Sequence, residues 1–209
     1  MDSWSGSAAL SDEELLSALL AVARGSRAGR RVARALFDRF GDLPEVCNAT
    51  EYQVRDLGRT VFPLLETVRR LIMRYSEAVV RSAPIALGTG ALSDLWRGRL
   101  GLLRFEAFEV AYLDASRRLV PQGLRRLSAG TVGKASVYPR RVLEGALRYE
   151  AAGFVLAHNH TNGDVTPTSH DLALTRSIVL SAELLDLAVY DHLIVSRGSV
   201  FSFRDAGLI

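Results

Sequence analysis

Two histidines separated by one residue, His158 and His160, are the side chains of this sequence best suited to chemistry. In an extended backbone, alternate side chains point to the same side, so both imidazoles can reach one ion. Asp171 follows after ten intervening residues and supplies a carboxylate. Two imidazoles and one carboxylate are typical of a zinc site that keeps an open position for water, whereas structural zinc usually has four protein ligands. The spacing therefore predicts a metal site formed by His158, His160 and Asp171.

The segments around these residues indicate how they are positioned. Residues 151–157 form a short apolar run typical of a buried strand, and the histidines come at its end. Residues 161–168 are rich in turn formers, and residues 169–186 have helical spacing, which puts Asp171 in the first turn of a helix. Thr168 and Asp171 also fit a helix cap, a role that needs no metal and can coexist with one. All four histidines lie between positions 158 and 192, which favours the metal interpretation.

This pattern resembles the signature of the JAMM metalloproteases, also called the JAB or MPN+ family, in which a hydroxyl residue lies three positions before the aspartate. Gly163, Pro167, Thr175 and residues 191–195 are similar to the bacterial RadC-like branch, and the resemblance runs from about Ala91 to the C-terminus. It implies a JAB/MPN-like (cytidine-deaminase-like) α/β fold with a mixed sheet flanked by helices. It also implies a bound Zn²⁺ and hydrolysis of a peptide or isopeptide bond in a peptide or protein substrate. The ligands alone would equally suit amide or phosphoester hydrolysis.

The family also has a glutamate on an upstream strand, and two residues compete for that position. From residue 105 the sequence alternates with period two, so Glu106 shares a face with Phe108 while Glu109 lies on the opposite face. The resemblance implies that Glu106 is the general base and then the proton donor to the leaving amine. Glu109 is the alternative if the other face looks toward the metal. Thr168 occupies the family's serine position and is expected to donate a hydrogen bond to the developing oxyanion.

The remaining elements of this half complete the sheet. Residues 119–124 are expected to return after a turn at 114–117, a helix begins at Pro139, and residues 193–195 pair with 200–203 in a hairpin. We expect His192 to be a hydrogen-bonded core residue, with support of a metal ligand as the minority interpretation. We expect His170 to be exposed.

The first 80 residues have a helical pattern. Ser11 opens a capping box before an apolar stripe at Leu15, Leu19 and Val22, and further helices are expected up to Gly41, over 50–57 and over 61–78. This predicts a helical domain over 1–80, a linker over 81–90, and the metal-dependent hydrolase domain over 91–209. In RadC relatives the helical part resembles a helix-hairpin-helix module, but here the hairpin has one glycine, Gly58, where two are common.

Composition and charge limit the kinds of partner that this protein is expected to have. The first 80 residues hold 11 arginines and 11 acidic residues, yet six arginines cluster between positions 24 and 39. Such a cluster is usually a solvated helix face and less often a phosphate contact, so DNA is a doubtful partner. The single cysteine, Cys47, the absence of a secretory signal and the lack of a bilayer-length apolar run favour a cytoplasmic protein without membrane contact. Two other functions stay open: a DNA-associated repair or replication accessory module, and a non-catalytic MPN interaction domain.

Overall fold

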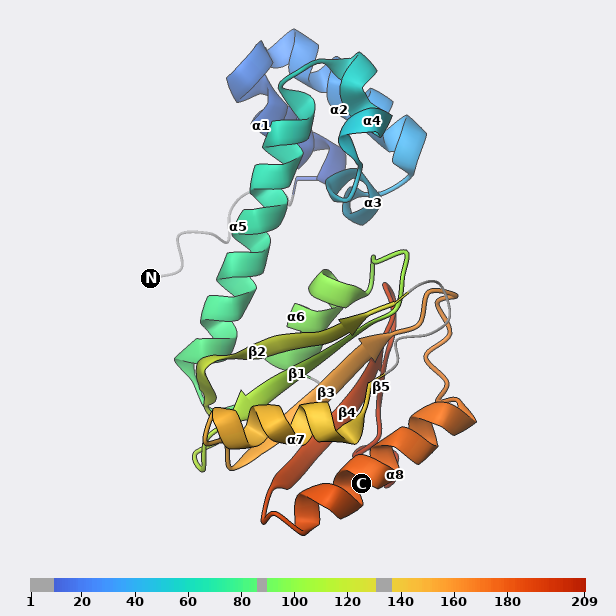
Figure 1. Cartoon of the computed structure of the whole chain (residues 1–209). Coiled ribbons are helices and arrows are strands. Elements are labelled where there is room, and N and C mark those ends of the chain that lie inside the picture. Colours follow the sequence, from blue (N-terminus) through green and yellow to red (C-terminus); the bar gives the residue numbers. More distant parts are fainter. Residues whose placement is uncertain (1–9, 86–89, 131–136) are drawn as a thin grey trace. The chain divides into compact units, whose positions relative to one another are not determined.

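The computed structural model describes residues 10–85, 90–130 and 137–209 (Figure 1). The chain divides into two compact units, residues 1–72 and 73–209, and the boundary falls within the long helix α5 (Val61–Ser82). The expected linker, 81–90, begins inside this helix, and its residues 86–89 lie outside the described part of the chain.

The first unit is helical. Its elements before α5 are α1 (Asp12–Arg24), α2 (Ser26–Phe40), α3 (Leu43–Cys47), α4 (Glu51–Val54) and the 3-10 turn η1 (Arg55–Leu57). Ser11 starts α1 through the predicted capping box with Glu14, and Gly41 ends α2 with φ of 88°, a conformation that glycine adopts without strain. The apolar spacing does not predict α3, which is short and begins after the capping residue Asp42.

The predicted apolar stripe of α1 is correct at Leu19, which packs against the core, and wrong at Leu15 and Val22. Leu16 and Leu20 are buried, whereas Leu15 is 49% exposed and Val22 is 90% exposed. The helix has adjacent leucines at 15–16 and 19–20, so two neighbouring stripes both satisfy the helical period. Packing against the buried residues of α2 to α5 selects the stripe that contains Leu16 and Leu20.

The second unit is built on a mixed sheet, as predicted, and the sheet has five strands. Its elements after α5 are α6 (Ala91–Leu100), β1 (Ala107–Leu113), β2 (Leu119–Ala129), α7 (Pro139–Arg148), β3 (Gly153–Asn159), α8 (Ser169–Glu183), β4 (Ala188–Val195) and β5 (Val200–Ser202). The strand order is β2-β1-β3-β4-β5, and only the β3–β4 pair is parallel. Because parallel neighbours need a crossover, the chain leaves the end of β3, passes through α8 and returns to the start of β4.

Helices cover both faces of this sheet (Figure 1). On one face, Leu95 and Trp96 of α6 pack with Ala111 and Val155. On the other face, residues of α7 and α8 such as Val142 and Ile178 pack with Phe108. Since every residue of β1 and β3 is buried, the two central strands present side chains to two separate cores. The face on which a side chain of β1 lies therefore determines whether it packs against α6 or against α7 and α8.

Candidate metal centre

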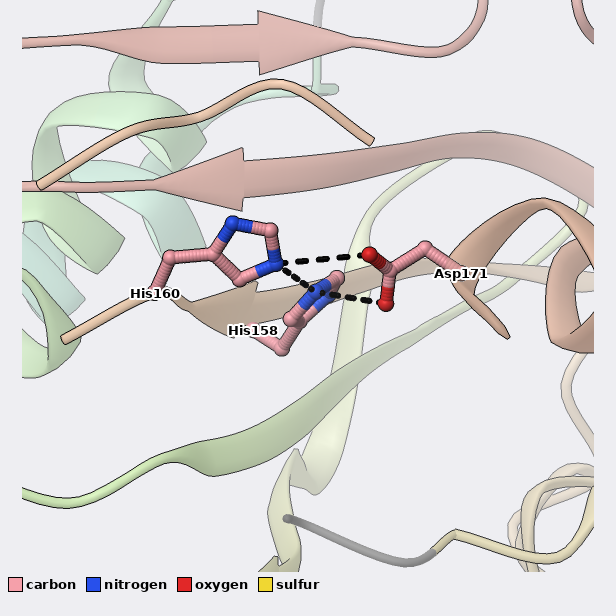
Figure 2. A group of neighbouring side chains, drawn as sticks. All are labelled: His158, His160 and Asp171. Atoms are coloured by element: carbon pink, nitrogen blue, oxygen red, sulfur yellow. Dashed lines mark hydrogen bonds and ion pairs between the residues drawn. The ribbon is translucent and has the colours of Figure 1, made fainter. Parts of the chain in front are cut away.

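The two spaced histidines lie at the carboxyl end of β3. His158 is within the strand, paired with Phe108 of β1 and Ile194 of β4, and His160 follows directly after the strand ends. Their Nε2 atoms lie 3.1 Å apart, so the two imidazoles converge on one point (Figure 2). This is the geometry that alternation along the strand predicts.

Asp171 reaches the same point from the first turn of α8. Its Oδ1 lies 3.1 Å from His158 Nε2, and its Oδ2 lies 3.3 Å from His160 Nε2 (Figure 2). Oδ2 also accepts hydrogen bonds from the Thr168 backbone N–H at 2.8 Å and from the Thr168 hydroxyl at 2.5 Å. The helix cap and the approach to the histidines are therefore compatible, and the cap holds the carboxylate in place.

These three residues are a group that could hold a metal ion, because their potential ligand atoms all lie within 4.8 Å of one another. The side chains of His158, His160 and Asp171 are 7%, 11% and 9% exposed. The group is therefore largely shielded by protein but keeps contact with solvent, which a site with an exchangeable water requires.

The electrostatics of the group favour a cation. Burial alone would raise the pKa of Asp171, but hydrogen bonds with His158, His160 and Thr168 outweigh it and hold the pKa well below its usual value. The hydrogen bond with Asp171 raises the pKa of His160; burial lowers it, and the charges of Asp171 and Glu106 raise it further. An ionised carboxylate and two converging ring nitrogens thus attract either a proton or a metal ion.

The two candidate glutamates have different surroundings. Glu106 precedes β1 directly and is half-buried, and its charge acts on His160. Glu109 is fully buried on the α6 face, where it accepts hydrogen bonds from Trp96 Nε1 at 3.1 Å, from Arg99 Nε at 2.9 Å and from Arg126 Nε at 3.0 Å. Glu109 is therefore the anion of a structural network, and Glu106 is the carboxylate on the histidine side.

Comparison with known proteins agrees with this arrangement. The family model described as the RadC-like JAB domain matches residues 89–208. The chain belongs to the RadC-like JAB domain family. Similar proteins include a UPF0758 protein of Methylibium petroleiphilum, 36% identical over 98% of this chain and 92% of the relative, and a UPF0758 protein of Ralstonia nicotianae, 33% identical over 97% and 91%. The RadC-like domain supports assignment to the JAMM superfamily of hydrolases, whose members typically bind zinc.

The donor set of this RadC-like domain fits a zinc ion. His160 Nδ1 lies 2.7 Å from the backbone carbonyl of Asp164, which can only accept, so the neutral ring carries its proton on that nitrogen and keeps a lone pair on Nε2. Two nitrogens and one carboxylate oxygen are ligands that zinc prefers. We conclude that His158, His160 and Asp171 fit the metal that the family implies.

Two residues of the RadC-like domain support the site: Asn159, which the sequence analysis did not assign to it, and His192, for which such support was the minority interpretation. Asn159 is 1% exposed, and its side chain bonds the backbone on both sides of Glu106. His192 is fully buried, with Nε2 2.9 Å from His158 Nδ1. Its expected core position is correct, but its contact with a candidate ligand favours the minority interpretation. The signal for both is their polarity inside strands that are otherwise apolar.

Two further findings concern His170 and the helices. His170, next to Asp171 in sequence, is exposed as predicted and lies outside the group of candidate ligands. Among the helices of the described residues, none combines the length and the apolar character needed to cross a membrane.

Proposed function

We propose that this protein is a zinc-dependent hydrolase of the JAMM type that cleaves a peptide or isopeptide bond. The observation that supports this most is the convergence of two Nε2 atoms and the Asp171 carboxylate at one partly shielded point. A neutral His160 with its proton on Nδ1 directs a lone pair at that point. Such an arrangement is electrostatically unfavourable without a cation, and family membership points to zinc.

In this proposal His158, His160 and Asp171 hold the ion and Glu106 moves protons. A zinc ion bound there would lower the pKa of its water toward neutrality and polarise the acyl carbonyl. The Glu106 carboxylate would accept a proton from the water that adds to the acyl carbon, and would deliver it to the nitrogen of the leaving amine as the C–N bond breaks. The half-buried position of Glu106, just before β1, leaves it solvent contact for this exchange.

Thr168 would stabilise charge on the substrate oxygen. Its hydroxyl has a single proton, which in the described arrangement points to Asp171 Oδ2 at 2.5 Å. To act as an oxyanion donor, the hydroxyl must rotate away from the Asp171 carboxylate. Thr168 is an exposed residue, which is consistent with that rotation.

The test combines metal content with peptidase activity. We expect the purified protein to hold zinc and to cleave peptide or isopeptide substrates in a chelator-sensitive manner. Asp171→Ala should lose both properties, while His170→Ala, a change at the exposed neighbour, should keep them. Equally low zinc in the wild type and in Asp171→Ala would refute the proposal. Zinc retention without any turnover would favour a non-catalytic interaction domain.

A second candidate function, contact with DNA, is favoured by one feature of α2. Four arginines at helical spacing, all exposed, form a basic stripe along this helix: Arg27, Arg30, Arg31 and Arg34. The other arginines of the cluster are engaged within the unit, since Arg39 pairs with Asp56 and Arg24 donates to the Leu57 carbonyl at 2.6 Å. The stripe is therefore the part of the cluster available to phosphate.

The DNA function is tested by salt dependence. If the stripe binds phosphate, the slope of log affinity against log salt should fall by about 0.9 for each arginine removed. We would compare a triple substitution at Arg30, Arg31 and Arg34 with Arg140→Ala, a change at an exposed arginine on α7. Equal slopes for the two variants would exclude the stripe as a DNA contact.

A further inference from the structure

A chain of buried polar contacts leads from His158 back to the backbone of Asp171. His158 Nδ1 lies 2.9 Å from His192 Nε2, and His192 Nδ1 lies 2.6 Å from the Thr175 hydroxyl oxygen. That hydroxyl lies 2.6 Å from the backbone carbonyl oxygen of Asp171, one helical turn earlier. His158, His192 and Thr175 are 5%, 0% and 2% exposed, so the protons of this chain must be shared among the protein groups.

With His192 as a neutral imidazole, the form that its complete burial favours, one arrangement of protons satisfies all three contacts. The Asp171 carbonyl can only accept, so the single proton of the Thr175 hydroxyl belongs between those two oxygens. The Thr175 oxygen must then accept from His192, which puts the His192 proton on Nδ1 and leaves its Nε2 as an acceptor. His158 therefore donates from Nδ1.

The opposite direction leaves a contact without a proton. If Thr175 donated to His192 Nδ1, the two oxygens 2.6 Å apart would face each other with lone pairs only. The His158 proton would then move to Nε2, the atom that faces His160 and Asp171. That placement would block the ligand position of His158.

We propose that Thr175 and His192 are positioning residues that hold the proton of His158 on Nδ1 and so direct the Nε2 lone pair at the metal point. This inference rests on the proposed metal site and explains how one of its ligands, His158, is held in the tautomer that can bind the ion. His160 reaches the same tautomer by a direct contact with the Asp164 carbonyl, whereas His158 needs two intermediaries because it lies deeper.

The packing of the rings fixes the same geometry. Phe203 stacks on His192 with ring centres 4.7 Å apart and an interplanar angle of 19°. Phe108 stacks on His158 with ring centres 5.8 Å apart and an angle of 10°. Both imidazole planes are thus held by aromatic neighbours, and the hydrogen bonds determine where each proton lies.

The decisive variant is Thr175→Val, which keeps the shape of the side chain and removes its hydroxyl. We expect zinc affinity, measured by competition with a chromophoric chelator, to fall by about 10- to 100-fold. Thr175→Ser, which restores the hydroxyl, should return the affinity close to that of the wild type. Thermal unfolding of the metal-free variants separates this effect from a general loss of stability.

A second measurement needs no variant and no metal. Long-range proton–nitrogen spectra of the nitrogen-15-labelled metal-free protein report which ring nitrogen of each histidine carries the proton. We expect His192 to carry it on Nδ1; a His192 proton on Nε2 would overturn the inference. Unchanged zinc affinity in Thr175→Val would overturn it as well, while the proposed metal site would stand. Absence of zinc binding by the wild type would instead refute the proposed function.

Discussion

The Asn159 side-chain oxygen accepts a hydrogen bond from the backbone N–H of Ala107 at 2.8 Å. Its amide nitrogen donates to the Phe105 carbonyl at 3.0 Å, so both bonds flank Glu106. The residue between the two histidines therefore ties the segment that carries the proposed base to the strand that carries the proposed ligands. This explains how Glu106 can hold a defined position although it lies before β1 begins.

Substitution of Asn159 should separate proton transfer from metal binding. Asn159→Asp keeps the acceptor for Ala107 and loses the donor to Phe105, which frees the segment around Glu106. Because small displacements of a catalytic group are costly, we expect kcat to fall by roughly 10- to 100-fold. Zinc affinity should stay near the wild-type value, since both histidines remain. An unchanged kcat would show that Asn159 does not position Glu106.

Glu106→Gln should abolish most turnover without loss of metal. The amide retains the size of the side chain but cannot take a proton, so we expect kcat to fall by about 10²- to 10⁴-fold. Zinc content and thermal stability should be close to those of the wild type. A variant that retained full activity would exclude Glu106 as the base.

Glu109→Gln is the matched change at the other candidate glutamate. It should lower stability and leave turnover intact, the reverse of what we expect for Glu106→Gln. Glu109 is fully buried and neutralises Arg99 and Arg126, whose side chains are 22% and 38% exposed. Removing the charge leaves Arg99 with Glu77 as its carboxylate partner and weakens the hydrogen bonds to both arginines, so the free energy of unfolding should fall by about 2 kcal/mol. Chemical denaturation measures this loss. Zinc affinity should be unchanged. A selective loss of turnover in the folded variant would make Glu109 a candidate for the general base again.

The stability of the metal-free protein and its affinity for zinc should change in opposite directions with pH. The hydrogen bond with Asp171 raises the pKa of His160 above its ordinary value of about 6.5. Without metal, the His160–Asp171 pair stabilises the fold below about pH 6.5, and this contribution is lost as the pH rises through the raised pKa. Zinc needs the unprotonated imidazole, so zinc affinity should rise over the same interval.

The difference in unfolding free energy between the wild type and His160→Gln isolates that contribution. In metal-free protein the difference should shrink as the pH increases from about 6 to 9. A difference that grew over this range would contradict the assignment.

Thr168 substitutions should distinguish a cap from an oxyanion donor. Thr168→Val removes the hydroxyl and should destabilise the protein by about 1 kcal/mol through loss of the helix cap. If the hydroxyl also stabilises the oxyanion, kcat should fall by about 10²- to 10³-fold. Thr168→Ser should recover both properties. If the Thr168→Val variant has lower stability and normal kcat, Thr168 caps the helix and does not stabilise the oxyanion.

Much of the site could be predicted from local sequence because its key distances are local. One intervening residue in an extended backbone puts the imidazoles of His158 and His160 on one side. A threonine and an aspartate three positions apart at a helix start form a capping box, which fixes Asp171 in the first turn of α8. Neither prediction required knowledge of which strands are neighbours.

The tertiary structure decided the relationships that depend on pairing between distant segments. Period two from residue 105 separates Glu106 from Glu109, but only the tertiary structure shows that Glu109 is buried against α6 and that the charge of Glu106 acts on His160. His192 reaches His158 because β4 pairs in parallel with β3. Local periodicity defines faces along one element, whereas strand register and helix packing, which join residues far apart in the chain, determine what each face meets.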